Sequence, residues 1–236
     1  MQPTYLPWIG YFSLIDQVDV LVFLDDVEFS HQSWQQRNRI KTDDGPMWLT
    51  VPVITSGRSG QIIREVEINT EERWRPKHRR SIHFNYANAE YYSEHDKWLE
   101  EVYNREWEKL CELNIFLIED LMRKLGMEVN IIFSSNLDAA GEKSHRLVNI
   151  CKEIGAPEYL SPLGSKDYIE NENPFPEAGI DLRYHSFEHP EYDQLYNGFV
   201  SHMSIIDLIL NAGPNSISVI REGQLKPHTS QDIENG

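Results

Sequence analysis

The chain has 236 residues, 40% of them hydrophobic and 25% charged, so it can bury a sizeable core as one large domain or two small ones. Its formal net charge of −16 argues against a nucleic-acid-binding protein, because phosphate backbones are bound by clustered lysines and arginines. No apolar stretch approaches the roughly 20 residues that span a bilayer, and the first residues lack the features of a signal peptide. We therefore expect a cytoplasmic protein without a transmembrane segment.

The first part of the chain has the composition of strands and loops. It opens on an aromatic segment in which Pro3 and Pro7 restrict the backbone, which predicts a stiff, non-helical arm. A short helix is expected next, at 11–19. Continuous or alternating apolar residues then predict strands, and Pro52 places the second of them at an edge or a bulge. These strands are expected over 19–29, 48–54 and 62–69.

The period of the apolar residues changes to three and four from residue 71 to about 124, which predicts helices that end at Gly126. Strands and helices alternate again downstream. The strands are expected over 130–135, 158–162 and 180–187, and the helices over 142–156 and 204–213. This order predicts an α/β fold with a mixed, partly parallel sheet and helices packed on its faces. We expect a single domain over 1–225, helical in its centre (about 71–125), and a flexible tail over 226–236.

The densest polar cluster follows the strand predicted over 19–29, and ligands of open α/β sheets bind beyond such strand ends. Basic residues alternate within it, so an extended conformation would direct them to one face, where they could hold a phosphate or a carboxylate. A solvated hairpin with internal ion pairs is the alternative. The candidate catalytic residues are Asp25, Asp26, Arg37 and Arg39, and the candidate substrate-binding residues are Trp34, Asn38 and Lys41.

Two further polar loops follow predicted strands. Their small hydroxyl residues, glycines and lysines would let backbone N–H groups approach an anion, although neither loop has the spacing of a phosphate-binding P-loop. Ordinary helix capping is the alternative. The candidate substrate-binding residues in these loops are Ser134, Ser135, Lys143, Ser161, Gly164 and Lys166. Because the ends of parallel strands meet at one sheet edge, we expect both loops to share a pocket with Arg37 and Arg39.

Two cysteines, Cys111 and Cys151, are too few for a disulfide framework and lack metal-ligand spacing, so we expect buried free thiols. The nine histidines form no zinc-binding pattern, and Pro190 disfavours a helical pairing of His185 with His189. We assign no metal ligands. The sequence also lacks a GxSxG nucleophile motif.

Several of these segments resemble the WbqC-like protein family, in order and across nearly the whole chain: QPTYLPWIGYF, DVLVFLDDVEFSHQSWQQRNRIK, WLTVPV, FSSNL, YLSPLGSKDY, HPEYDQ and MSIIDLILNAG. Members typically begin with a short apolar strand followed by HQPxYLPWxGYF, whereas this chain has Met1 at the position of that histidine. The resemblance therefore implies either a start codon upstream of Met1, which we favour, or a shortened copy. The arm then becomes a loop between strand and helix, where Gln2, Tyr5 and Trp8 are candidate substrate-binding residues.

The resemblance implies a role in the biosynthesis of O-antigen or other surface polysaccharides. We expect an enzyme that tailors a nucleotide-activated or lipid-linked sugar. A looser similarity of layout to nucleotidylyl transferases suggests acyl or aminoacyl transfer after activation of a carboxylate by ATP, with Mg²⁺ at Asp25 or Asp26. The alternative is a non-catalytic protein that binds a glycan intermediate or a partner enzyme, with aromatic rings stacked on sugars. Packing in the core is the competing explanation for these aromatics, and the sequence leaves the oligomeric state open.

Overall fold

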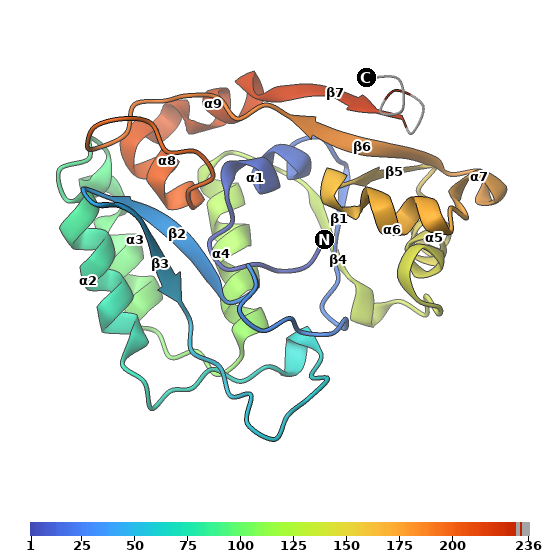
Figure 1. Ribbon diagram of the computed structural model, residues 1–236, viewed down its shortest axis with the longest axis horizontal. Helices are drawn as coiled ribbons and strands as arrows, with labels where there is room; N and C mark the ends of the chain where they lie inside the picture. Colours follow the sequence, from blue (N-terminus) through green and yellow to red (C-terminus); the bar gives the residue numbers. More distant parts are fainter. Residues whose placement is uncertain (230–231, 233–236) are drawn as a thin grey trace.

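Helices and short strands alternate along the computed structural model, which describes residues 1–229 and 232 (Figure 1). The strands are β1 (Val20–Phe23), β2 (Arg37–Thr42), β3 (Gly45–Thr50), β4 (Asn130–Phe133), β5 (Glu158–Ser161), β6 (Asp181–Phe187) and β7 (Gln224–His228). The α-helices are α1 (Ile9–Ile15), α2 (Trp74–Tyr86), α3 (Tyr92–Asn104), α4 (Leu110–Lys124), α5 (Lys143–Ile154), α6 (Lys166–Asn171), α7 (Phe175–Ala178), α8 (Ile205–Ala212) and α9 (Ser216–Glu222). Short 3₁₀ helices lie at η1 (Ile63–Glu65), η2 (Ser134–Asn136), η3 (Leu163–Ser165) and η4 (Gly213–Asn215).

The strands form three small sheets in which parallel and antiparallel pairs occur together. β1 pairs in parallel with β4, β2 forms an antiparallel hairpin with β3, and β6 lies between parallel β5 and antiparallel β7. The predicted α/β class is confirmed. The expectation that all strands form one sheet is wrong, because β1 and β5 face each other across a gap without pairing.

A cavity of about 490 Å³ occupies this gap, lined by β1, β5 and apolar residues of α1 and α5. At its rim the amine of Met1 donates to the carbonyl of Val22 (2.5 Å), and the Leu24 N–H donates to the Met1 carbonyl (2.8 Å). These two bonds follow the pattern of a parallel ladder, so Met1 extends the β1 sheet by one residue. Burial lowers the pKa of the Met1 amine to about 5.

The predicted helices and caps of the central and C-terminal regions match the structure closely. α5 ends at Gly155, whose φ of +71° is readily adopted only by glycine. α8 begins after Ser204, whose hydroxyl accepts a hydrogen bond from the Ile206 N–H (3.3 Å). α2, α3 and α4 together occupy the range predicted to be helical.

Two sequence expectations about strands are corrected. Residues 62–69 form η1 and three isolated bridges rather than a strand, because the N–H groups of Ile63 and Arg64 bond the carbonyls of Val27 and Asp25 in a loop. β3 ends at Thr50, before Pro52. At the C-terminus, β7 places residues 226–228 of the expected tail in a sheet, whereas 230–231 and 233–236 lie outside the described residues.

Two apolar clusters make up the core. The larger surrounds α4 and α8 and includes Tyr5, Phe12 and Tyr86, all fully buried. The smaller lies beneath β5 and β6 and includes Phe175 and Tyr184. Among the residues that the structure describes, no helix has both the length and the apolar character needed to cross a bilayer.

Candidate functional site

The β2–β3 hairpin presents a pair of tryptophans to solvent. Asp43 and Asp44 form its turn, and Gly45, which begins β3 opposite Thr42, has a φ of +103°. The register places Trp48 opposite Arg39, and Trp34 precedes β2. The Trp34 and Trp48 rings lie 5.4 Å apart and are 49% and 43% exposed. Large apolar rings are usually covered by the fold, so an exposed pair marks a surface suited to contact with a ligand.

Arg37 and Arg39 lie against these rings. The Arg37 guanidinium carbon is 4.4 Å from the Trp48 ring centroid, and that of Arg39 is 5.6 Å from Trp48 and 5.8 Å from Trp34. Within the described part of the chain neither arginine has an ion pair with a carboxylate, although the protein has 38 acidic residues. The Nε atom of Arg39 is buried without a hydrogen-bond partner. Both cations are therefore free to bind an anion, and the described residues provide none of the internal ion pairs that the alternative interpretation required.

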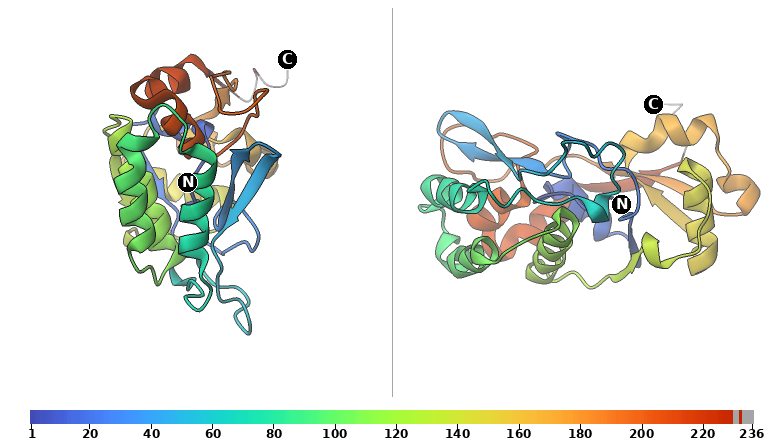
Figure 2. Two further views of the ribbon diagram at one scale, coloured as in Figure 1. Left: turned by 90° about the vertical axis from the view of Figure 1, so that its left-hand side faces the viewer. Right: turned by 90° about the horizontal axis from the view of Figure 1, so that it is seen from below.

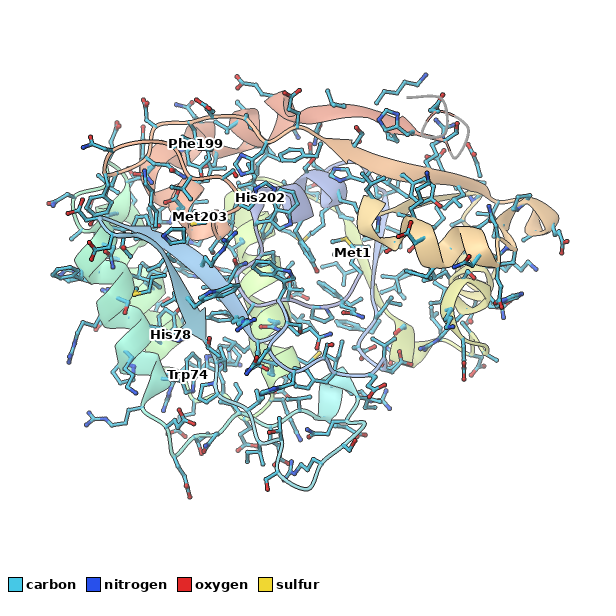
Figure 3. The ribbon with its side chains drawn as sticks, in the orientation of Figure 1. Met1, Trp74, His78, Phe199, His202 and Met203 are labelled. Atoms are coloured by element: carbon cyan, nitrogen blue, oxygen red, sulfur yellow. The ribbon has the colours of Figure 1, made fainter. Side chains whose placement is uncertain are left out.

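The surface continues to Trp8 and His202, which come from opposite ends of the chain. Their rings stack with centroids 4.8 Å apart, and Arg39 Nη2 lies 3.5 Å from the His202 carbonyl. Figure 3 labels His202 beside Met203, in the loop before α8. The Arg39 carbonyl accepts from the Ser204 N–H at 2.8 Å. These contacts join the arm, the hairpin and the loop before α8 into one aromatic–arginine surface, comprising Trp8, Trp34, Arg37, Arg39, Trp48 and His202.

His202 has an unusual backbone and a fixed neighbour. Its φ is +60°, in the left-handed region that non-glycine residues rarely adopt. Its N–H donates to His189 Nε2 (3.1 Å), so His189 carries its proton on Nδ1, which lies 2.9 Å from the Pro190 carbonyl. Burial lowers the pKa of both histidines, and for His202 the nearby Arg39 lowers it further. Both rings are thus neutral near pH 7.

Buried polar groups hold this loop in place. Asp207 of α8 accepts hydrogen bonds from Tyr86 (2.7 Å), Tyr192 (2.8 Å) and Gln194 (2.7 Å). Burial raises the pKa of Asp207 despite these donors. Lys41 is also buried, and its ammonium group donates to the carbonyls of Tyr196 (3.4 Å) and Gly198. Lys41, predicted to bind substrate, therefore binds the protein's own backbone.

The predicted acidic residues form a second, separate cluster. Asp25 and Asp26 follow β1, while Ser134 and Ser135 follow β4, so the parallel pairing brings all four together. Asp25 accepts from the Ser135 N–H (3.0 Å) and hydroxyl (2.7 Å), and Ser134 Oγ lies 2.5 Å from Asp26 Oδ1. Arg146 donates to Asp26 at 2.5 Å.

The hydrogen bonds from Ser134, Ser135 and Arg146 already occupy the carboxylate oxygens of Asp25 and Asp26. Burial opposes ionisation of Asp26, but hydrogen bonds from Arg146 and Ser134 outweigh it and lower the pKa of that carboxyl. Among the described residues no three His, Cys, Asp or Glu side chains are placed to hold a metal ion together. The geometry of this cluster supports a role in tying β1 to β4 and α5.

The remaining predicted residues do not join the hairpin. Lys143 begins α5 and Lys166 begins α6, and both helices lie at the opposite end of the molecule from β2 and β3 in Figure 1 and in the right-hand view of Figure 2. Ser161 is buried at the end of β5, and Gly164 lies in η3. None of these residues lines the cavity between β1 and β5 or the pocket beside α2 and α3. The expected shared pocket is wrong, because Arg37 and Arg39 lie in the β2–β3 hairpin, while the two loops follow β4 and β5, which belong to two other sheets.

Residues of the arm serve mainly to pack it. Tyr5 is fully buried, with its hydroxyl 2.9 Å from His78 Nδ1 and 2.8 Å from the Tyr103 hydroxyl. Asn38 is buried and donates to the Leu6 carbonyl (2.7 Å). Gln2 is exposed and accepts from the Gln35 amide (2.8 Å). Tyr5 and Asn38 therefore have no surface to offer a ligand, while Trp8 is half-buried at the aromatic–arginine surface.

Sequence reasoning missed four residues of these clusters, namely Trp48, His189, His202 and Arg146. The turn at Asp43 and Asp44, followed by Gly45, was the available signal for Trp48, because it fixes the hairpin register opposite Arg39. The histidines and Arg146 gave no local signal, since their partners are distant in sequence. Cys111 and Cys151 are buried free thiols as expected, and burial raises their pKa values to about 12 and about 11.

Comparisons with known proteins agree with the resemblance. The sequence profile of the WbqC-like protein family matches residues 2–219. A Mycobacterium tuberculosis (strain ATCC 25618 / H37Rv) protein described as "Uncharacterized protein Rv1507c" is 35% identical over 223 residues, which cover 94% of this chain and 96% of that protein. No solved structure matches the chain. A match over nearly the full length shows that the chain belongs to the WbqC-like protein family.

Proposed function

We propose that the aromatic–arginine surface binds a phosphate-bearing sugar, and that the protein is an enzyme of surface polysaccharide (O-antigen type) biosynthesis that tailors a nucleotide-activated or lipid-linked sugar. The observation that carries the proposal is the pairing of two exposed tryptophans with two arginines that lack a carboxylate partner among the described residues.

The two kinds of side chain suit the two halves of such a ligand. Indole rings stack on the faces of sugars or bases, and guanidinium groups bind phosphate oxygens through paired N–H donors. The rings also lie under the guanidinium carbons of Arg37 and Arg39, which restrains them before any ligand arrives. This combination favours a ring joined to a phosphate over an uncharged glycan.

The reaction we propose is transfer of an acyl or aminoacyl group to an amino sugar. A donor carboxylate would attack the α-phosphorus of ATP and release pyrophosphate, and the sugar amine would then attack the acyl adenylate and release AMP. ATP and Mg²⁺ would be co-substrates. Arg37 and Arg39 would stabilise phosphate charge, which is the main electrostatic task in this chemistry.

A non-catalytic role in binding a glycan intermediate is the second candidate. It is favoured by the acidic cluster, in which Ser134, Ser135 and Arg146 already occupy the carboxylates of Asp25 and Asp26. Under this alternative the same surface would bind the sugar phosphate without any turnover.

Binding is tested by calorimetric titration with UDP-N-acetylglucosamine, UMP and N-acetylglucosamine. We expect saturable binding of the nucleotide sugar and a loss of about tenfold in affinity for Arg37→Ala or Arg39→Ala, the size of one charge-assisted hydrogen bond. Arg123→Ala is the matched control, because Arg123 is an exposed arginine on α4 paired only with Asp120. Equal affinities for all variants would reject this site.

Turnover separates the two candidates. The protein is incubated with ATP, Mg²⁺, amino acids and UDP-linked amino sugars, and pyrophosphate release is compared with that of the Arg37→Ala/Arg39→Ala double variant. If the protein releases pyrophosphate and the double variant does not, the result supports an enzyme. Saturable binding without release for any donor supports the binding protein instead.

A further inference from the structure

Helix α2 and the loop after it form the most basic segment of an acidic protein. Residues 73–89 contain no aspartate or glutamate, although acidic residues make up 38 of the 236 positions. Within the same segment lie five cationic residues in eight positions, Arg73, Arg75, Lys77, Arg79 and Arg80. The rest of the chain therefore has a formal charge of −21, from −16 less the +5 of this segment.

The helical period divides these residues between two faces. Trp74, His78 and Ile82 are buried on the side of α2 that meets the protein interior, and Figure 3 labels the first two there. Arg75 and Arg79 are directed toward α3. Arg75 donates to the carbonyls of Asn104 (3.3 Å) and Arg105 (2.6 Å), and Arg79 pairs with Asp96.

The remaining cations form a line on the outer side. Arg73, Lys77, Arg80 and Phe84 are spaced by four, three and four residues, so they follow one stripe about 17 Å long. All four are exposed, and no ion pair engages the three cations within the described part of the chain. Phe84 is 81% exposed, more than Trp34, Trp48 or Leu163. We call these four residues the α2 stripe.

We propose that the α2 stripe docks the protein on an anionic bilayer surface. The three cations would lie among lipid phosphates, and the phenyl ring of Phe84 would insert at the level of the head groups. Helix α2 lies at one end of the molecule beside α3, so a flat surface can approach it (Figures 1 and 2).

The shape of the stripe favours a bilayer over a folded partner. A stable protein interface buries more than about 1,000 Å² and needs a complementary surface, whereas the stripe is one convex face of a single helix. A bilayer requires only a few cations and an aromatic ring. The acidic remainder of the protein would be repelled by the same lipids, which orients the molecule with α2 toward the surface and makes binding weak and sensitive to salt.

Co-sedimentation with vesicles tests the proposal. We expect the 236-residue protein to bind vesicles containing equal amounts of phosphatidylglycerol and phosphatidylcholine at least tenfold better than phosphatidylcholine alone, and to be released by 0.5 M NaCl. The triple variant Arg73→Gln/Lys77→Gln/Arg80→Gln should lose at least tenfold in apparent affinity, and Phe84→Ser severalfold. The matched control is Lys97→Gln/Arg123→Gln/Lys152→Gln, which removes three exposed cations from α3, α4 and α5.

Circular dichroism and melting temperatures show whether each variant is folded. The proposal is overturned if the protein does not distinguish the two vesicles, or if the folded triple variant binds as well as the control triple variant. It is also overturned if polyglutamate or duplex DNA binds the stripe while phosphatidylglycerol vesicles do not. These outcomes are independent of sugar binding at the hairpin, because no stripe residue belongs to the aromatic–arginine surface.

Discussion

The hydroxyl group of Tyr5 lies 2.9 Å from Nδ1 of His78, linking the opening arm to helix α2 in the interior of the protein. The same hydroxyl lies 2.8 Å from that of Tyr103 on α3. Burial raises the pKa of Tyr5 well above its usual value and lowers that of His78 to about 4, so both groups are neutral near pH 7. The arm's rigidity thus comes from bonds made inside the core.

Tyr5→Phe should therefore change stability without changing ligand affinity. It removes the hydroxyl that His78 and Tyr103 use as a partner, which typically costs about 2 kcal/mol for buried polar groups. For a chain of this size that corresponds to a fall in Tm of roughly 4–8 °C, measured by calorimetry. A variant with unchanged Tm but weaker UDP-sugar binding would instead place Tyr5 in the ligand site.

His78 should make stability depend on pH on the acid side. Its pKa is lowered from 6.5 to about 4 in the folded protein, so below pH 6.5 the unfolded chain binds a proton that the folded protein does not. The free energy of unfolding should then fall by up to about 1.4 kcal/mol per pH unit between pH 6.5 and 4. Urea titrations of His78→Gln should show a shallower slope over this range and no difference in slope above pH 7. Burial also lowers the pKa of His185 to about 4, so this histidine still contributes to the pH dependence of stability in the His78→Gln variant.

Arg146 should stabilise the protein only while Asp26 is ionised. The folded pKa of Asp26 is lowered, so the stability from this pair is present above about pH 4 and is lost as the pH falls through the folded pKa. We expect Arg146→Met to reduce the free energy of unfolding by about 1.5 kcal/mol at pH 7. The difference from wild type should shrink toward pH 3 in urea titrations. A difference that is constant over this range would mean that Arg146 acts by packing alone.

The cavity between β1 and β5 should accept an apolar strand joined to Met1. The ladder already begun at Val22 and Leu24 would continue with residues beside Val20–Val22. An added Val-Ile-Val-Ile segment should raise Tm by about 5 °C or more, because it buries apolar side chains and removes a buried amine.

A Gly-Ser-Gly-Ser extension is the matched control for this experiment, since it also converts the amine to a peptide group but has no apolar side chains. Alkylation of Cys151, which lines the cavity, gives a second readout when Cys111 is replaced by serine. The Val-Ile-Val-Ile extension should slow this alkylation, because it would cover Cys151. Equal Tm values for the two extensions would show that the cavity does not take a strand.

Elements with a complete local signal could be predicted from the sequence. α5 combines an apolar stripe with Gly155 at its end, and α8 combines Ser204 as its cap with an apolar run. Residues 62–69 misled the prediction, because their apolar side chains alternate as in a strand while their backbone bonds a neighbouring loop. The local spacing of apolar residues indicates which side chains are buried, but the pairing of the backbone depends on which segment of the chain lies beside it.

The candidate site was only partly predictable for the same reason. Arg37, Arg39 and Trp34 lie in a visibly polar and aromatic segment, so residue types alone drew attention to them. The stacking of Trp8 on His202 joins residues 194 positions apart, as their numbers show, and depends on the path of the whole chain. The three-sheet arrangement is likewise tertiary, and it separates Lys143 and Lys166 from the hairpin.

The anchoring of the loop before α8 affects how fast and how strongly a ligand would bind. This segment has no regular secondary structure over 188–203, yet Asp207 holds Tyr192 and Gln194, and Lys41 holds Tyr196 and Gly198. The conformational entropy of the loop is therefore lost when the protein folds, and little remains to be lost when a ligand arrives. Association should resemble that of a rigid receptor, with a rate set by diffusion and orientation.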